Sequence, residues 1–205
     1  AAQLIENDFL VPFNQFEGFE ELLKARSMAN IVKNGWGYNG NYYVLPLYTN
    51  PMAYWWNKDI LDELGVDVPR TYGDVLNLGA MYNDPSKQKY TLLVRYEPAW
   101  WDRWFDFCMS YQANSGGKAY WDEEKVLFND EHGLKYMEFI NELFLKQYAP
   151  IENFQDPLQK GIVLGSIEGP WNISYTKETY PDFNYVIAPP LVPDDYPANQ
   201  PIHLC

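Results

Sequence analysis

Two short segments each place a tryptophan three residues after a glutamate. Residues 97–103 read EPAWWDR, and residues 168–172 read EGPWN. A pyranose ring has apolar C–H faces and a rim of hydroxyl groups, so a sugar site needs flat aromatic rings for the faces and carboxylate or amide groups for the rim. The two segments therefore predict a carbohydrate site that contains Glu97, Glu168 and the neighbouring tryptophans.

The first segment contains three tryptophans, Trp100, Trp101 and Trp104. Each carries roughly 150–250 Å² of surface, so it needs either a protein core or a ligand to cover it. Helical spacing lines Trp104 up with Trp100 and Cys108, further along the same helix. We expect Trp104, Phe105 and Cys108 to fill the core, and Trp100 and Trp101 to form a platform for the sugar.

In the second segment Gly169 and Pro170 precede Trp171. Glycine permits a close approach to the backbone, and proline suits the first position of a helix, which fixes where Trp171 projects. The pattern favours Trp171 as a ligand-stacking residue. The alternative is a tryptophan at the start of a helix that packs on the sheet.

Catalytic patterns are sparse by comparison. Glu97 and Glu168 could serve as the two carboxylates of a glycoside hydrolase, and this alternative stays open. The chain has two histidines and two cysteines, with no GxSxG, metal-ligand spacing or phosphate-binding glycine loop. We therefore expect no cofactor and no metal ion.

The composition restricts the class of partner. With 28 acidic and 15 basic residues the formal net charge is −13, which opposes binding to nucleic acid or anionic lipid. Aromatic residues make up 18% of the chain, which suits a pocket lined with rings but also an aromatic-rich protein-interaction domain. No apolar run approaches the roughly 18 residues of a membrane span.

Periodicity and turn residues predict alternating strands and helices. Helices are expected at 15–32, at 58–64 after the cap Asn57, at 72–82 after a capping box at Thr71 and Asp74, at 99–111, after the cap Asn129, and from Pro170. Strands are expected at 42–48, 53–57, 90–96, 161–169 and 184–190, a hairpin within 119–128, and loops at 34–41 and 114–117. This order predicts an α/β fold with a partly parallel sheet and helices on both faces. Ligands of such sheets bind among the loops at the strand ends, which points to 48–52, 96–101 and 168–172.

Four longer stretches, in this order, resemble one family. They are YNGNYYVLPLYTNPMAYWWNKDILDELGVDVPRTYGDVL, FNDEHGLKYMEFINELFLKQYAP, GIVLGSIEGPWNIS and PDFNYVIAPPLVP. Together they look like the corresponding segments of the family 1 extracellular solute-binding proteins. These are sugar-binding components of ABC importers and include the maltose-binding protein.

The resemblance implies a periplasmic-binding-protein-like two-lobe α/β fold of type II, with an incomplete first lobe and most of the second. We expect residues 1–48 to be part of lobe one, 49–52 the hinge crossing, 53–200 lobe two, and 201–205 the start of the return crossing. The missing segments imply a piece of a longer protein whose signal sequence lies elsewhere.

The resemblance also implies a function. The protein would bind a carbohydrate, expected to be an oligosaccharide, between the lobes and deliver it to the permease subunits of an ABC importer. It would be a monomer without enzymatic activity, periplasmic or extracellular and anchored to the cell envelope as a lipoprotein. By position, Trp171 would stack on the sugar, Glu97 and the aromatic residues after it would line the second lobe, and Tyr48, Thr49 and Asn50 would lie at the hinge.

Overall fold

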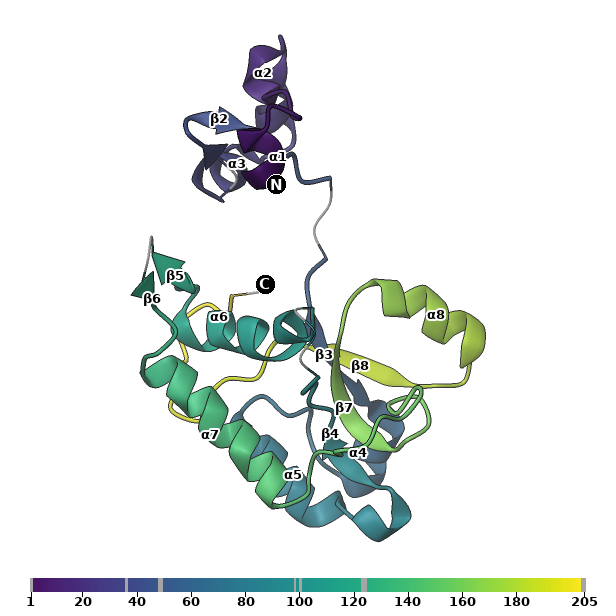
Figure 1. Cartoon of the computed structure of the whole chain (residues 1–205). Coiled ribbons are helices and arrows are strands. Elements are labelled where there is room, and N and C mark those ends of the chain that lie inside the picture. Colours follow the sequence, from purple (N-terminus) through teal and green to yellow (C-terminus); the bar gives the residue numbers. More distant parts are fainter. Residues whose placement is uncertain are drawn as a thin grey trace. The chain divides into compact units, whose positions relative to one another are not determined.

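The computed structural model describes residues 2–35, 37–47, 50–97, 99, 101–122 and 125–203. The chain divides into two units, Ala1–Thr49 and Asn50–Cys205. Figure 1 shows both units, coloured along the sequence.

The first unit is built from short helices and one hairpin. Its elements are α1 (Ala2–Glu6), the 3-10 helix η1 (Phe13–Gln15), α2 (Phe19–Ala25), α3 (Ala29–Gly35), β1 (Gly37–Tyr38) and β2 (Asn41–Tyr42). Its small core consists of Phe19, Leu23, Met28 and Val32, which are spaced as expected for one face of helical structure.

The single helix predicted over 15–32 is wrong, because the structure divides it into α2 and α3. Ser27 has a φ of 54°, which an α-helix cannot accommodate. The Met28 amide donates to the Leu23 carbonyl at 2.9 Å, which closes the end of α2. Since Leu23 and Met28 are both buried, this bend points them into the same core.

Within the described part of the predicted strand 42–48, only Tyr42 belongs to a strand, so the prediction is wrong at 43–47. The strand Asn41–Tyr42 pairs, antiparallel, with Gly37–Tyr38. The turn between them is Asn39-Gly40, with φ values of 50° and 76°. Two positive φ values are required by the two-residue turn that best fits the twist of a hairpin, and Asn-Gly is its preferred sequence. The predicted loop 34–41 therefore contains part of a helix and a hairpin turn.

The second unit is organised around a four-stranded sheet. Its order is β4-β7-β3-β8, with β3 at Ala53–Asn57, β4 at Tyr90–Leu92, β7 at Val163–Glu168 and β8 at Tyr185–Ala188. β4 runs parallel to β7, whereas β3 is antiparallel to both of its neighbours. The prediction of an α/β fold with a partly parallel sheet is confirmed.

Helices pack on both faces of this sheet, as expected. They are α4 (Lys58–Leu64), α5 (Tyr72–Tyr82), the 3-10 helix η2 (Pro85–Lys87), the π-helix η3 (Trp104–Cys108), α6 (Met109–Ser115), α7 (Glu131–Leu145) and α8 (Trp171–Thr179). In Figure 1, α5, α6 and α7 lie on one side of the sheet and α8 on the other. Tyr54 and Trp56 of β3 face the larger core with α5 and α7, while Trp55 between them faces a smaller cluster with Leu158 and Val163.

The predicted caps of two helices are confirmed. The Asn57 side chain accepts from the Ile60 amide at 3.1 Å, and Gly65 ends α4 with a φ of 67°. At α5, Thr71 and Asp74 form the predicted capping box. Pro170 precedes the first residue of α8, one position outside the helix that was predicted to begin there.

The helix predicted from 99 to 111 runs further and is irregular. It includes the π-helical segment Trp104–Cys108, continues as α6 to Ser115, and ends at Gly116 with a φ of 71°. The predicted hairpin is present as β5 (Trp121–Asp122) and β6 (Lys125–Val126).

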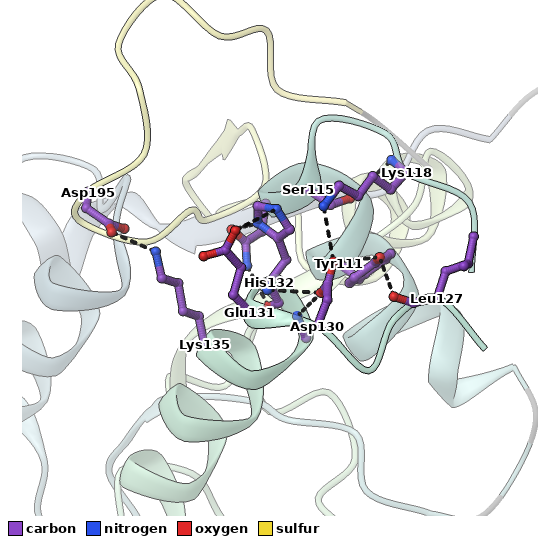
Figure 2. Close-up of polar contacts among 11 residues, drawn as sticks. Tyr111, Ser115, Lys118, Leu127, Asp130, Glu131, His132, Lys135 and Asp195 are labelled. Carbon is purple, nitrogen blue, oxygen red and sulfur yellow. Dashed lines mark hydrogen bonds and ion pairs between the residues drawn. The ribbon is translucent and has the colours of Figure 1, made fainter. Parts of the chain in front are cut away.

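Asp130, and not the predicted Asn129, caps α7. Its carboxylate accepts from the amides of His132 and Gly133, and it also pairs with Lys118 at 3.2 Å (Figure 2). The buried face of α7 carries Tyr136, Phe139 and Leu143, whereas Leu134 and Met137, which the apolar pattern includes, are exposed.

No helix within the described part of the chain is long and apolar enough to span a membrane.

Candidate functional site

Several chain segments meet at one edge of the sheet in the second unit. The parallel strands β4 and β7 both end at this edge. Ala53, the first residue of β3, pairs with Glu168, and Ala188, the last of β8, pairs with Tyr54. The segments 50–52, 95–97, 168–171 and 189–190 therefore lie near one another, as expected for the ligand-binding edge of such a sheet. The segment 50–52 reaches this edge by preceding β3, and not, as predicted, by following a strand.

Arg95 and Glu168 face each other at this edge. Leu92 pairs with Gly165 across β4 and β7, and each charged residue follows three positions later. The Arg95 guanidinium donates to Glu168 Oε1 at 3.2 Å, and the Ser166 hydroxyl donates to the same oxygen at 2.9 Å. Burial raises the pKa of Glu168 above its ordinary value, although Arg95 and Ser166 both favour the carboxylate.

Sequence reasoning found Glu168 but missed Arg95. Residues that follow two adjacent parallel strands lie side by side, so the position of Arg95 beside Glu168 would follow from the register of β4 against β7. The register itself depends on contacts between segments 73 residues apart, which no local pattern reveals.

Trp171 begins α8 with 48% of its surface exposed, so it is not a core residue. Its six-membered ring lies over Gly169. A Cβ atom built on Gly169 would be 2.0 Å from Trp171 Cζ3 and 2.1 Å from Cη2. Gly169 is therefore needed at this position because the indole occupies the space that a side chain would fill.

Phe105 and Arg95 complete the surroundings of Trp171. The rings of Phe105 and Trp171 meet edge to face, with centroids 5.8 Å apart and planes at 75°. The Arg95 guanidinium carbon lies 4.6 Å from the centre of the Phe105 ring, which is a cation–π geometry. Phe105 is half-buried against the main core.

Glu97 is exposed, and its carboxylate accepts from the Asn153 side-chain amide at 3.1 Å. The backbone around it is held by Arg103, which donates to the carbonyl oxygens of Arg95 at 2.8 Å and Glu97 at 3.2 Å. Arg103 also pairs with Asp106 at 3.0 Å. Burial raises the pKa of Asp106 to about 6. Arg103 therefore links the backbone at Arg95 and Glu97 to Asp106 of the π-helix.

The tryptophans of residues 96–105 are not divided between core and surface as predicted. Trp101 is 53% exposed, as a platform residue would be. Trp104 is 38% exposed and meets Tyr120 edge to face, so its predicted place in the core is wrong. Asn50 is exposed. Trp100, Tyr48 and Thr49 lie outside the described residues.

A cavity of about 460 Å³ opens beside this edge, between α8 and the sheet face that carries Trp55. It is almost entirely apolar, and Glu168 and Gly169 line it together with Trp55, Ile173 and Ile187. Among the described residues, no three His, Cys, Asp or Glu side chains group together as metal ligands would.

The family follows from a match along almost the whole chain. The model of the bacterial extracellular solute-binding proteins matches residues 1–203. The chain belongs to this family. The family resemblance stated from the sequence is therefore confirmed.

Three individual proteins are similar to this chain along most of its length. The maltotriose-binding protein of Pyrococcus abyssi (strain GE5 / Orsay) is 26% identical over 194 residues, which are 92% of this chain and 40% of the relative. A crystal structure of an uncharacterized protein from Listeria monocytogenes EGD-e has a TM-score of 0.82 and 33% identity, covering 94% of this chain and 50% of that one. An ABC transporter solute-binding protein from Thermotoga lettingae TMO, bound with α-D-tagatose, has a TM-score of 0.67 and 25% identity over 95% and 51%. The chain thus spans about half the length of these relatives or less.

Proposed function

We propose that this chain is part of a solute-binding protein that binds a carbohydrate and delivers it to an ABC importer. The observation that carries the proposal is Trp171, a half-exposed indole held on Gly169 at the ligand-binding edge of the sheet. The named ligands of two relatives, maltotriose and α-D-tagatose, are both sugars.

The two units support a two-lobe arrangement. Residues 1–48 would belong to lobe one, 49–52 to the hinge crossing, 53–200 to lobe two and 201–205 to the start of the return crossing. The division into units at 49/50 agrees with this hinge. Sugar would bind on one lobe, and closure of the lobes would bury it, provided that the sugar binds the closed state more tightly than the open one.

Within the site, Trp171 would stack on a sugar face, and Trp100 and Trp101 would form a second aromatic surface. Glu97, Glu168 and Asn50, with Tyr48 and Thr49 at the hinge, would contact the hydroxyl rim. Glu168 uses Oε1 for both Arg95 and Ser166, so its Oε2 is the oxygen that would accept from a sugar hydroxyl.

We infer binding without catalysis. A glycoside hydrolase needs one carboxylic acid that protonates the leaving group and a second that acts as base or nucleophile. Burial raises the pKa of Glu168, but its carboxylate is already held by a guanidinium and a hydroxyl, and that of Glu97 is held by the Asn153 amide. Neither arrangement resembles an acid held ready beside a base.

The partners follow from the same proposal. They would be the sugar and the permease subunits of the importer, and the binding protein would act as a monomer outside the cytoplasmic membrane, anchored to the cell envelope. The net charge of −13 gives no support to nucleic acid as a partner.

Calorimetric titration with maltotriose and with α-D-tagatose tests the proposal. We expect one of them to bind, and Trp171→Ala to raise the Kd about tenfold or more, which is about 1.4 kcal/mol. Tyr175→Ala is the matched control, because Tyr175 lies one turn along the same helix and is 40% exposed. The titrated sugar is then recovered and analysed by chromatography. Hydrolysed sugar, or equal weakening by both variants, would overturn the proposal.

A further inference from the structure

Five residues, Trp171 among them, form a closed ring of contacts. Trp171 meets Phe105 at 5.8 Å between centroids, Phe105 lies under the Arg95 guanidinium at 4.6 Å, and Arg95 binds Glu168 at 3.2 Å. Glu168 is joined by its backbone to Gly169, on which the Trp171 ring rests. The contacts therefore link the two strand ends and the first turn of α8 into one unit.

The ion pair within this ring is sheltered from water. The side chains of Arg95 and Glu168 are 31% and 14% exposed. Surface ion pairs are weakened by solvent and by side-chain entropy, whereas a sheltered pair with a second hydrogen bond keeps a fixed geometry. Ser166 supplies that second hydrogen bond. The Glu168 carboxylate is thus held by two partners, one of them the guanidinium whose carbon lies 4.6 Å from the centre of the Phe105 ring.

We propose that Arg95 and Phe105 are positioning residues, which hold the Trp171 indole on Gly169 in the orientation that receives a sugar. The inference rests on the proposed function of Trp171 in carbohydrate binding and deepens it. Arg95 would act through Phe105 and not through the ligand.

Holding the ring in advance has a defined effect on affinity. A side chain that is ordered only on binding costs about 0.5–1.5 kcal/mol, so releasing Trp171 would raise Kd roughly 2- to 10-fold at about 1.4 kcal/mol per tenfold. The effect on Kd of replacing Arg95 would be transmitted through Phe105, so it would vanish once Trp171 itself is removed.

Four variants separate the links of the ring. Phe105→Leu removes the ring edge that meets Trp171, and Phe105→Tyr restores it. Arg95→Met removes the cation, whereas Arg95→Lys keeps a charge beside Glu168 but lacks the planar surface over Phe105. If Arg95→Met fails to fold, Arg95→Lys tests the same link.

Two measurements are made on the whole protein. The first needs no ligand: 5-fluorotryptophan is incorporated and the ¹⁹F resonance of Trp171 is identified by its loss in Trp171→Phe. We expect this line to shift and narrow in Arg95→Lys and Phe105→Leu, with the resonances of buried Trp55 and Trp56 unchanged.

The second measurement is the Kd for maltotriose, or for α-D-tagatose if only that sugar binds. It should rise 2- to 10-fold in Arg95→Lys and Phe105→Leu, and return toward the original value in Phe105→Tyr.

A double-mutant cycle decides between positioning and direct contact. In a Trp171→Ala background, we expect Arg95→Lys to leave Kd unchanged. An equal loss of affinity in that background would overturn the proposal, because Arg95 would then act without Trp171. A Trp171 resonance that neither variant shifts would overturn it as well. Absence of any sugar binding would instead refute the proposed function, while the ¹⁹F measurement still decides whether the ring is held.

Discussion

A methyl group at position 169 would compete directly with the Trp171 ring. The Cβ of Gly169→Ala would lie 2.0, 2.1 and 2.6 Å from three ring carbons, where ordinary contact begins at 3.4 Å. The nearest carbon must therefore retreat by at least 1.4 Å, the difference between 3.4 and 2.0 Å. The three nearest atoms all belong to Trp171, so the substitution acts on this ring before any other group.

The cost should fall on binding and not on folding. Overpacking inside a core costs about 1–3 kcal/mol, but Trp171 is 48% exposed and can swing toward solvent. Gly169 has no positive φ, so alanine introduces no backbone strain there. We expect the free energy of unfolding to change by less than about 1 kcal/mol, and the Kd for maltotriose to rise about tenfold, which is about 1.4 kcal/mol.

Calorimetric titration and urea unfolding of Gly169→Ala, Trp171→Ala and the double variant check this expectation. Once the indole is gone, the methyl group has nothing to displace, so the double variant should bind as Trp171→Ala does. The reasoning is refuted if Gly169→Ala binds as tightly as the unaltered protein while Trp171→Ala does not. It is refuted equally if the methyl group weakens binding further in the absence of the indole.

Two stability predictions accompany it. Burial raises the pKa of Asp106 from 3.8 to about 6, so the folded protein holds this proton more tightly than the unfolded chain and loses stability as the pH rises from about 4 to 6. Asp106→Asn lacks this loss. Urea unfolding should therefore show that the free energy of unfolding of the variant, relative to the unaltered protein, rises by roughly 1–3 kcal/mol between pH 3.5 and 7.5, with solvent screening favouring the lower end. A difference between the two proteins that does not change with pH would contradict the expectation. Thr71→Ala removes the capping box of α5 and the 2.6 Å hydrogen bond to Asp194, and should lower the free energy of unfolding by about 1 kcal/mol or more. Thr71→Ser keeps the hydroxyl, so a similar loss in that variant would contradict a capping role.

Features that rest on neighbouring residues were predictable from the sequence. The caps at Asn57 and Thr71 depend on a side chain reaching an amide three residues away, and Gly65 is the expected end of α4. The edge of the sheet that carries the candidate site was predictable too, because ligands of α/β sheets bind among the loops at the ends of the strands. The hairpin turn at Asn39-Gly40 has an equally local signal, because Asn-Gly is the preferred sequence of such a turn, although only a loop is predicted there.

Features that depend on tertiary packing were not predictable. Residues 15–32 have apolar side chains at helical spacing, yet Ser27 breaks the helix so that Leu23 and Met28 reach one core. α7 shows the same limit, because its apolar residues exceed what one face can bury. Only the packing against α6 and the sheet selects Tyr136 and Phe139 over Leu134 and Met137.

The π-helix explains why the aromatic segment could not be divided correctly from its spacing. α-Helical spacing places Trp104 with Trp100 and Cys108, but Trp104–Cys108 is a π segment that bonds i to i+5, so α-helical spacing does not predict which of its side chains share a face. Trp104 then meets Tyr120 at the surface, while Phe105 turns toward Trp171 and Arg95, and Asp106 reaches Arg103. π segments occur frequently at functional sites. Here Phe105 of the π segment lies against both the guanidinium of Arg95 and the ring of Trp171, so this segment supplies the contact between the residues that follow β4 and the tryptophan of α8.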